Sequence, residues 1–407
     1  LVLTARTAIN DVVIDDLTEL TGEEKNPPEI YLDKLQATEI DWFIETLDTY
    51  GYWGERAGHS AEAKARFIKE ECQSQIHAIL LKLLSSPYVG GKVQKLVKEL
   101  RADTINYKML LSAHVLTILS CKVDTDILTD IWGIETVSRN EFRQSPIVRE
   151  FVDFKSGEVT VKSAVVAEYI LQNTSDAATI VNVLITMIEC AHKLRTNPIY
   201  FSLFKDLMRH SNLQMIVPED DRMKAVIRFY EAAKNLERCK SNPQFWLQYA
   251  IASLVYGDLK RSKFYFDTSY SLAAKKTEYD TFMIDNHYAR FLLVQAIKDF
   301  AHEEAMNNFR EACTIIRQQI RFERRHYTYR VATFLKAFMD RFENSLSASE
   351  LEEVISIAKE VSERIAKLPE GRQNHHNIVD CSKAMRYIAE RGADIISKKK
   401  NKEGSSK

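Results

Sequence analysis

A pattern that recurs in the C-terminal half of the sequence restricts the fold more than any other feature. A small residue, a phenylalanine and a second small residue recur as small-x-x-x-Phe-x-x-small, in copies that start 37 and 43 residues apart. The copies are Ala225, Phe229 and Ala232, then Ser262, Phe266 and Ser269, then Ala305, Phe309 and Ala312. This interval is close to the period of helix-turn-helix repeats, so the pattern predicts stacked helical hairpins whose small residues let helices approach around each ring.

The second copy also has the pattern of a tetratricopeptide first helix, because Trp246, Tyr249 and Ala250 precede it at the matching spacing. Glycine and proline are scarce, with 12 and 8 among 407 residues, and the segments between them are rich in helix-forming residues. We therefore predict a mainly α protein. Residues 174–397 would form a tetratricopeptide-like α-solenoid, and the basic residues 398–407 a disordered tail.

The start of the chain predicts two short strands. Apolar residues at 1–3 and at 30–32 have the pattern of buried strands, and a sheet needs more than these two. We assign residues 1–35 to the truncated edge of a larger sheet. Since the chain opens on Leu1 and not on methionine, we expect the natural protein to begin upstream.

Residues 36–104 predict a small subdomain of three helices. The first helix is expected to start near Thr38, whose hydroxyl can cap it. The second is expected over 60–84, with Pro87 ending it, and the third over 93–100.

Residues 105–173 predict helices and a β-hairpin. The helices are expected over 109–121, 125–132, 138–150 and 163–171, and the hairpin strands are expected at 152–154 and 159–161. The strands are predicted because Val152 and Phe154 alternate with polar residues, as Val159 and Val161 do. Three helices followed by a hairpin is the order of a winged helix, which we predict here.

The overall composition narrows the class of protein. The 56 Lys and Arg balance 57 Asp and Glu, which argues against a body that binds polyanions over its whole surface. Six cysteines lie tens of residues apart without a Cys-x-x-Cys, and no apolar run reaches about 18 residues. We expect a protein of the reducing cytoplasm that has no membrane partner.

Taken in order, a strand ending in Thr4-x-Arg6, a helical subdomain, a winged helix and a repeat solenoid resemble the C-terminal half of a STAND ATPase. This is a signal-transducing P-loop family that includes bacterial antiviral sensors and immune receptors. The resemblance implies that the helical subdomain is the family's lid. It also implies that Arg6 senses the terminal phosphate of ATP, with Thr4 as a possible hydroxyl contact.

Two departures from the family pattern limit what this chain can do alone. No Gly-x-x-x-x-Gly-Lys-Ser/Thr occurs, and no strand ends in paired acids. ATP or ADP with Mg is therefore expected only in the full-length protein, and we expect no catalysis by this chain alone. Where many family members carry a histidine after the hairpin, this sequence has Lys162, a candidate for the phosphate contact.

A row of arginines is the candidate surface for a partner. Arg310, Arg317, Arg321 and Arg324 are spaced by seven, four and three residues, so they share one helix face. Such a row could receive an acidic peptide or a nucleic-acid backbone. The alternative is a solvated face, with Glu311 and Glu323 as local ion-pair partners.

Other clusters carry weaker signals. His375, His376, Asp380 and Cys381 are metal-ligand types, but no second cluster completes a shell, and we predict no metal site. No nucleophile signature such as Gly-x-Ser-x-Gly occurs.

The resemblance implies the regulatory and sensor half of a STAND-type NTPase, concerned with bacterial antiviral defence. The solenoid would bind a protein or peptide trigger, and ATP-dependent homo-oligomerisation would switch on an upstream effector. Two alternatives remain open: a winged-helix transcriptional regulator, and a tetratricopeptide adaptor. A regulator would read DNA through Arg139, Arg143 and Arg149, but Pro146 interrupts that helix, and we do not expect nucleic acid as the partner.

Overall fold

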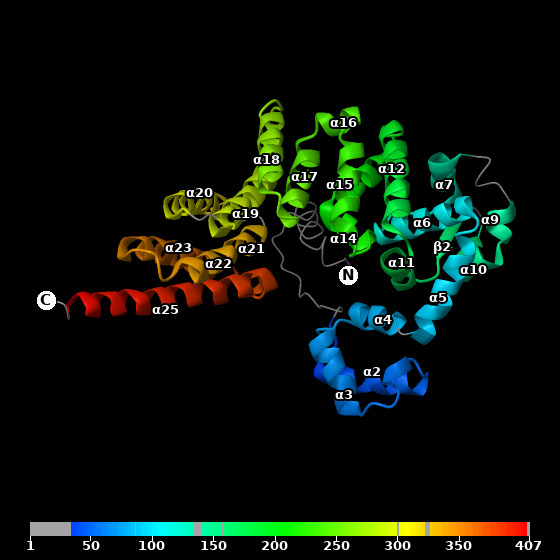
Figure 1. Ribbon diagram of the computed structural model, residues 1–407, viewed down its shortest axis with the longest axis horizontal. Coiled ribbons are helices and arrows are strands. Elements are labelled where there is room, and N and C mark those ends of the chain that lie inside the picture. The colour runs from blue at the N-terminus through cyan, green and yellow to red at the C-terminus, as the bar shows by residue number, and fades with distance from the viewer. Residues whose placement is uncertain are drawn as a thin grey trace. The chain divides into compact units, whose positions relative to one another are not determined.

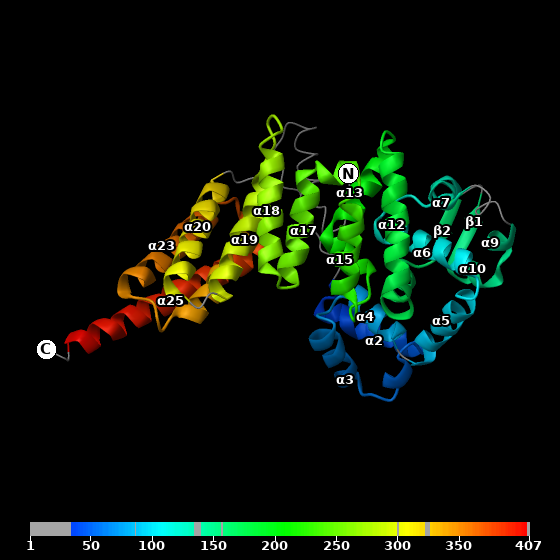
Figure 2. The ribbon, with the colours of Figure 1, turned by 45° about the horizontal axis from the view of Figure 1, so that its top comes forward.

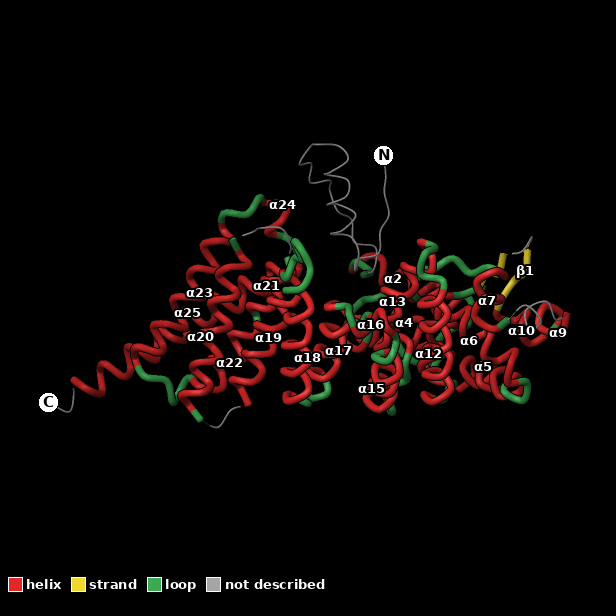
Figure 3. The backbone as a smooth tube through the Cα atoms, turned by 90° about the horizontal axis from the view of Figure 1, so that it is seen from above, coloured by secondary structure: helices red, strands yellow, loops and turns green. Residues whose placement is uncertain are grey.

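The computed structural model describes residues 34–85, 87–133, 140–155, 158–298, 301–321 and 326–404. The described chain is mainly α-helical, with one two-stranded sheet, as the colours of Figure 3 show. It divides into two compact units, one ending at Tyr256 and one starting at Gly257. The predicted mainly α class is confirmed. The predicted strands at 1–3 and 30–32, with Thr4 and Arg6, lie outside the described residues.

The first helices of the chain enclose a small core around Trp53. They are α2 (Ala37–Thr49), α3 (Ala61–Arg66), α4 (Ile76–Leu84) and α5 (Pro87–Leu100), with a short turn at Gly54–Arg56 and a π turn at Phe67–Glu71. Trp53 is buried and meets Phe67 edge to face, and its indole N–H donates to the carbonyl oxygen of Ile44 at 3.4 Å. Apolar residues of α2 and α4, among them Ile79, complete this core.

Three details of this bundle differ from the sequence prediction. The helix α2 begins after Gln36, whose backbone N–H donates to the Glu39 carboxylate at 2.7 Å, so Thr38 does not cap it. The single helix predicted over 60–84 is broken, because Gln73 and Ser74 have positive φ angles of 50° and 59°. Pro87 starts α5 instead of only ending the previous helix, since the first turn of a helix needs no N–H from proline.

The next segment contains the predicted helices and hairpin. Its elements are α6 (Thr104–Ile118), α7 (Thr125–Trp132), α9 (Asn140–Gln144), α10 (Pro146–Phe151), β1 (Val152–Lys155), β2 (Glu158–Val161) and α11 (Ala164–Tyr169), followed by a π turn at Ile170–Thr174. Val152 pairs with Val161 in antiparallel register, which confirms the hairpin. The predicted third helix is divided at Ser145, where Pro146 starts α10.

The remaining helices of the first unit are α12 (Ala177–Lys193), α13 (Pro198–Met208), α14 (His210–Ile216), α15 (Arg222–Ala233), α16 (Glu237–Lys240) and α17 (Pro243–Val255). The long helices α12, α15 and α17 lie side by side in Figures 1 and 2. Each of these three helices buries an apolar face against its neighbour. They form the repeat-like part of this unit.

The second unit consists of helices alone among its described residues. They are α18 (Leu259–Ala273), α19 (Phe282–Lys298), α20 (His302–Ile320), α21 (Tyr327–Ala332), α22 (Phe334–Phe342), α23 (Ala348–Ala366), α24 (Glu370–Gln373) and α25 (His376–Gly404). In Figure 1, α20, α23 and α25 lie one beside the next. The helix α25 continues through Gly404 and so enters the predicted disordered tail, because the lysines there favour helix.

Candidate functional site

The first repeat copy packs through a cluster of aromatic rings. Phe229 on α15 is fully buried, and its neighbour Tyr230 stacks on Tyr249 of α17 at 4.9 Å between ring centroids. Phe245 of α17 meets Tyr230 edge to face. Trp246, singled out from the sequence, lies partly exposed and donates its indole N–H to the Lys240 carbonyl oxygen at 3.1 Å. The buried rings of this helix are therefore those of Phe245 and Tyr249.

The small residues of the first copy flank this ring cluster. Ala225 is buried and Ala232 is partly buried, while Ala233 beside it is fully enclosed. The buried small residues that flank Phe229 on α15 are therefore Ala225 and, about two turns later, Ala233.

The other two copies place their phenylalanines against a later helix of the same unit. Phe266 of α18 meets Phe291 of α19 at 5.6 Å, and Phe309 of α20 stacks on Phe338 of α22 at 4.4 Å. Their flanking small residues are all buried: Ser262, Ser269, Ala305 and Ala312. Phe266 therefore packs against the helix that follows its own, and Phe309 packs against the second helix after its own.

The arginine row lies on α20, opposite a matching row of glutamates on α23. Arg310 donates two hydrogen bonds to the carboxylate of Glu353, at 2.8 and 2.9 Å. One heptad further, Arg317 donates two to Glu360, at 2.7 and 2.9 Å. Because both rows step by seven residues, the two helices run parallel with their charged faces in register. We call these two ion pairs the Arg–Glu row.

The Arg–Glu row is strongly hydrogen-bonded but open to solvent. The hydrogen bond from Arg317 lowers the pKa of Glu360, and the one from Arg310 lowers the pKa of Glu353. The four side chains are between 38% and 48% exposed, so water screens the charges. Each pair should therefore stabilise the fold by no more than about 0.2–1 kcal/mol.

The glutamates of this row were not identified from the sequence. The sequence offered Glu311 and Glu323 as local partners, but the partners of Arg310 and Arg317 are Glu353 and Glu360, 43 residues away in each case. The equal heptad step in both segments was a signal that could have found them. To use this signal, one would also have to know that α20 and α23 are neighbours.

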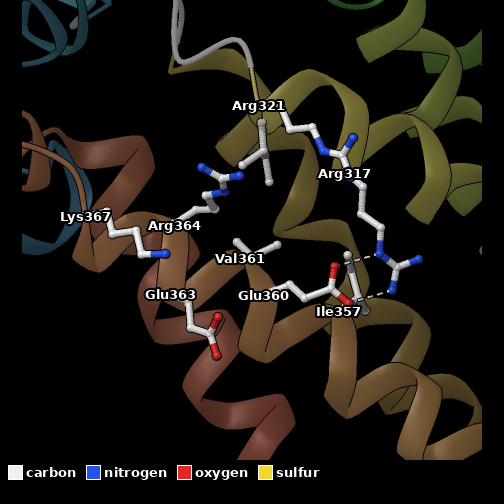
Figure 4. A pocket seen from close by; sticks show the side chains of 9 residues that line it. Arg317, Arg321, Ile357, Glu360, Val361, Glu363, Arg364 and Lys367 are labelled. Atoms are coloured by element: carbon white, nitrogen blue, oxygen red, sulfur yellow. Dashed lines mark hydrogen bonds and ion pairs between the residues drawn. The ribbon is translucent and has the colours of Figure 1, made fainter.

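A pocket opens where the Arg–Glu row ends. It has a volume of about 250 Å³ and is lined by Arg317, Ile320, Arg321, Ile357, Glu360, Val361, Glu363, Arg364 and Lys367. In Figure 4, Arg364 and Lys367 extend from α23 on the side where Arg321 lies at the end of α20. A second hollow of about 440 Å³ lies along the same two helices and includes Arg310 and Glu353. Arg324, the last residue of the predicted row, lies outside the described residues.

Lys162 follows the hairpin and already has partners. Its ammonium group donates to the carbonyl oxygen of Arg149 at the end of α10 and lies 3.7 Å from the carboxylate of Asp153. Arg149 itself donates its Nε–H to the carbonyl oxygen of Arg143 at 2.7 Å. Both cations are therefore occupied by groups of their own segment in this arrangement.

The described residues contain neither a cluster of metal ligands nor a membrane-spanning helix. No group of three or more His, Cys, Asp or Glu residues in the described ranges could hold a metal ion. Within the same ranges, no helix is long and apolar enough to cross a bilayer.

The histidines singled out from the sequence lie close together. The ring of His375 lies 4.1 Å from that of His326 and 4.4 Å from that of His376, between ring centroids.

Comparisons with known proteins give one likeness. No family model matches the chain, and no curated protein matches it. Among solved structures, the chain is similar to the Signal Transduction ATPase with Numerous Domains (STAND) protein with a tetratricopeptide repeat sensor from Pyrococcus horikoshii, at 13% identity and a TM-score of 0.25. The match covers 91% of this chain and 56% of that protein, so the chain spans just over half of its length. At this TM-score the likeness carries no argument, and the fold assignment rests on the helices and hairpin described above.

Proposed function

We propose that this chain is the regulatory and ligand-sensing part of a STAND-type NTPase. Its helical repeats would bind a protein trigger, and the segments before them would hold or release a nucleotide. The observation that supports the proposal most is the order of parts in one chain: a helical bundle, helices with a hairpin, and then repeats packed through buried phenylalanines.

In this proposal residues 105–173 are a winged helix. A short bridge between Asp124 and Glu158 supports the assignment, because it adds a third strand-like segment to the hairpin, directly before α7. The backbone N–H of Val159 also donates to the carbonyl oxygen of Val123 at 3.3 Å. A segment between the first two helices that pairs with the wing is what this fold requires.

The nucleotide would be ATP or ADP with Mg, held by a P-loop that the 407 residues do not contain. Arg6 would contact the terminal phosphate, because a guanidinium stays charged and offers a fork of donors to phosphate oxygens. Thr4 would add a hydroxyl contact. Lys162 could reach a phosphate only after leaving Asp153 and the Arg149 carbonyl, so its release would accompany a change of state.

Trigger binding would act by shifting the equilibrium between two arrangements of the protein, one of them open. A ligand that binds only the open arrangement moves the equilibrium by its difference in affinity for the two states. We propose that the open state exchanges nucleotide and forms a homo-oligomer that switches on an upstream effector, in bacterial antiviral defence. The cytoplasm is the compartment where such a protein would act.

Nucleotide binding by the product of the intact gene tests this proposal. We expect fluorescent ATP to bind the intact protein and Arg6→Ala to weaken that binding about tenfold or more, since a charge-assisted contact is lost. Arg56→Ala is the matched control, because Arg56 pairs with Glu71 on the surface of the helical bundle. Absence of nucleotide binding, or salt-sensitive binding of duplex DNA in its place, would contradict the proposal and favour the regulator.

A further inference from the structure

The pocket at the end of the Arg–Glu row carries an excess of positive charge. Arg317 and Glu360 neutralise each other, which leaves Arg321, Arg364 and Lys367 around the pocket against Glu363 alone. Among the residues that the structure describes, none forms a hydrogen bond or ion pair with these three cationic side chains. The pocket therefore has donors to offer to an anion.

The row itself indicates what kind of anion fits. The acids of α23 stand at Glu353 and Glu360, and the next heptad position is Lys367. The first two positions each give a carboxylate to an arginine of α20, and the third gives a cation. The chain thus supplies its own carboxylate twice and lacks one where Arg321 and Arg364 lie.

The surroundings favour a single carboxylate over a polyphosphate. Glu352, Glu353, Glu360 and Glu363 all lie on α23 along the two hollows. A nucleic-acid backbone laid along this groove would meet these negative charges on either side of the pocket. A single carboxylate from an acidic protein segment would meet three cations against one unpaired acid, Glu363, in the fork geometry that the Arg–Glu row already uses.

The size of the pocket agrees with this occupant. Sites for drug-sized ligands have about 300–1,000 Å³, and this pocket has about 250 Å³, enough for one or two side chains and too small to enclose a nucleotide. Ile320, Ile357 and Val361 supply an apolar floor for the methylene groups of a glutamate. An alternative role for these cations is to offset the helix dipole at the C-termini of α20 and α23. That role would not require the three side chains to share one pocket with an apolar floor.

We propose that this pocket binds a carboxylate side chain from an acidic segment of the trigger protein. Recognition by the repeats would then consist of completing the Arg–Glu row with a third acid, donated by the partner to Arg321, Arg364 and Lys367. The inference rests on the proposed function for the identity of the partner as a trigger, while the carboxylate site stands on the geometry of α20 and α23.

Peptide binding to the 407-residue chain tests the site. The probe is fluorescein-labelled hexaglutamate, followed by anisotropy, with hexaglutamine and a six-residue oligothymidylate as comparison ligands. Lys367→Glu places an internal acid at the third position of the row, so it should weaken hexaglutamate binding tenfold or more. Lys359→Glu makes the same charge change on the same helix at an exposed residue outside the pocket, and should change binding less than twofold.

Three results would overturn the inference: no hexaglutamate binding, equal losses in the two variants, or tighter binding of the oligonucleotide. Thermal unfolding of both variants separates a lost site from a lost fold. The outcome is independent of nucleotide binding by the intact protein. If that binding fails while the peptide result holds, the proposed function falls and the carboxylate site remains.

Discussion

Helix α20 meets α22 and α23 through surfaces of opposite chemistry. Towards α22 it presents Phe309, which is buried and stacked on Phe338, and towards α23 it presents Arg310 and Arg317, which are half exposed. Burying a ring removes apolar area from water, whereas a solvated ion pair gains little. The ring contact should therefore determine stability, and the Arg–Glu row should determine register and what can bind beside it.

The largest effect is expected on the apolar side. Phe309→Ala should lower the free energy of unfolding by about 3–5 kcal/mol, because it removes a buried ring and leaves a cavity. Urea unfolding followed by circular dichroism measures it. Phe264→Ala is the control on α18, since that ring is 63% exposed, and it should change the free energy by less than about 0.5 kcal/mol.

A smaller effect is expected where α25 packs on α23. A Cβ at Gly392 would lie 2.6 Å from Cγ1 of Ile355, so Gly392→Ala should destabilise the fold by about 1–3 kcal/mol. Helix propensity alone predicts the opposite sign. Gly91→Ala on α5 has open space around the new methyl group and should stabilise by about 0.4–1 kcal/mol. Equal effects of the two substitutions would show that α23 and α25 do not approach so closely.

The start of α23 should give a pH-dependent effect of about 1 kcal/mol. Partial burial would raise the pKa of Glu350, but hydrogen bonds from the backbone and hydroxyl of Ser347 and contact with His302 lower it to about 2. A lowered pKa stabilises the fold above the usual value of 4.5, and this contribution is lost as the pH falls towards 2.

Glu350→Gln should therefore destabilise at pH 7, and the difference from the natural chain should shrink at pH 3. Urea unfolding at the two pH values measures this, with Glu352→Gln as a control at an exposed position of the same turn. A difference that stays constant with pH would contradict the assigned role of the carboxylate.

The smallest effect is expected in the Arg–Glu row. Arg317→Met keeps most of the aliphatic stem and removes the two hydrogen bonds to Glu360, so it should cost about 0.2–1 kcal/mol, and less in 1 M NaCl. A double-mutant cycle with Glu360→Gln isolates the coupling energy. A coupling above about 2 kcal/mol would mean that the row stabilises the fold as strongly as a buried contact.

The sequence predicted the elements with local signals better than the contacts between them. The phenylalanines of the repeat and the hairpin at Val152 and Val161 follow from periodicity; the three rings are buried, and the two strands pair. The break at Gln73 and Ser74 was missed, because neither residue type marks a positive φ angle in advance. Helix boundaries were also missed, because a proline can end one helix or begin the next. Pro87 begins α5.

The candidate site was only partly predictable for the same reason. The spacing of Arg310, Arg317 and Arg321 places them on one face, and the structure has all three on or directly after α20. Their partners and pocket neighbours lie on α23, which no local pattern connects to α20. The nucleotide residues Thr4 and Arg6 stay a prediction, since they lie outside the described residues.

The central proposal is that nucleotide binding changes the state of the hairpin segment of this chain. Hydrogen–deuterium exchange of the intact gene product, loaded with ADP or with a non-hydrolysable ATP analogue, tests it most directly. The account predicts different exchange in residues 158–174, where Lys162 holds Asp153 and the end of α10. Identical exchange in the two nucleotide states throughout this chain would contradict it.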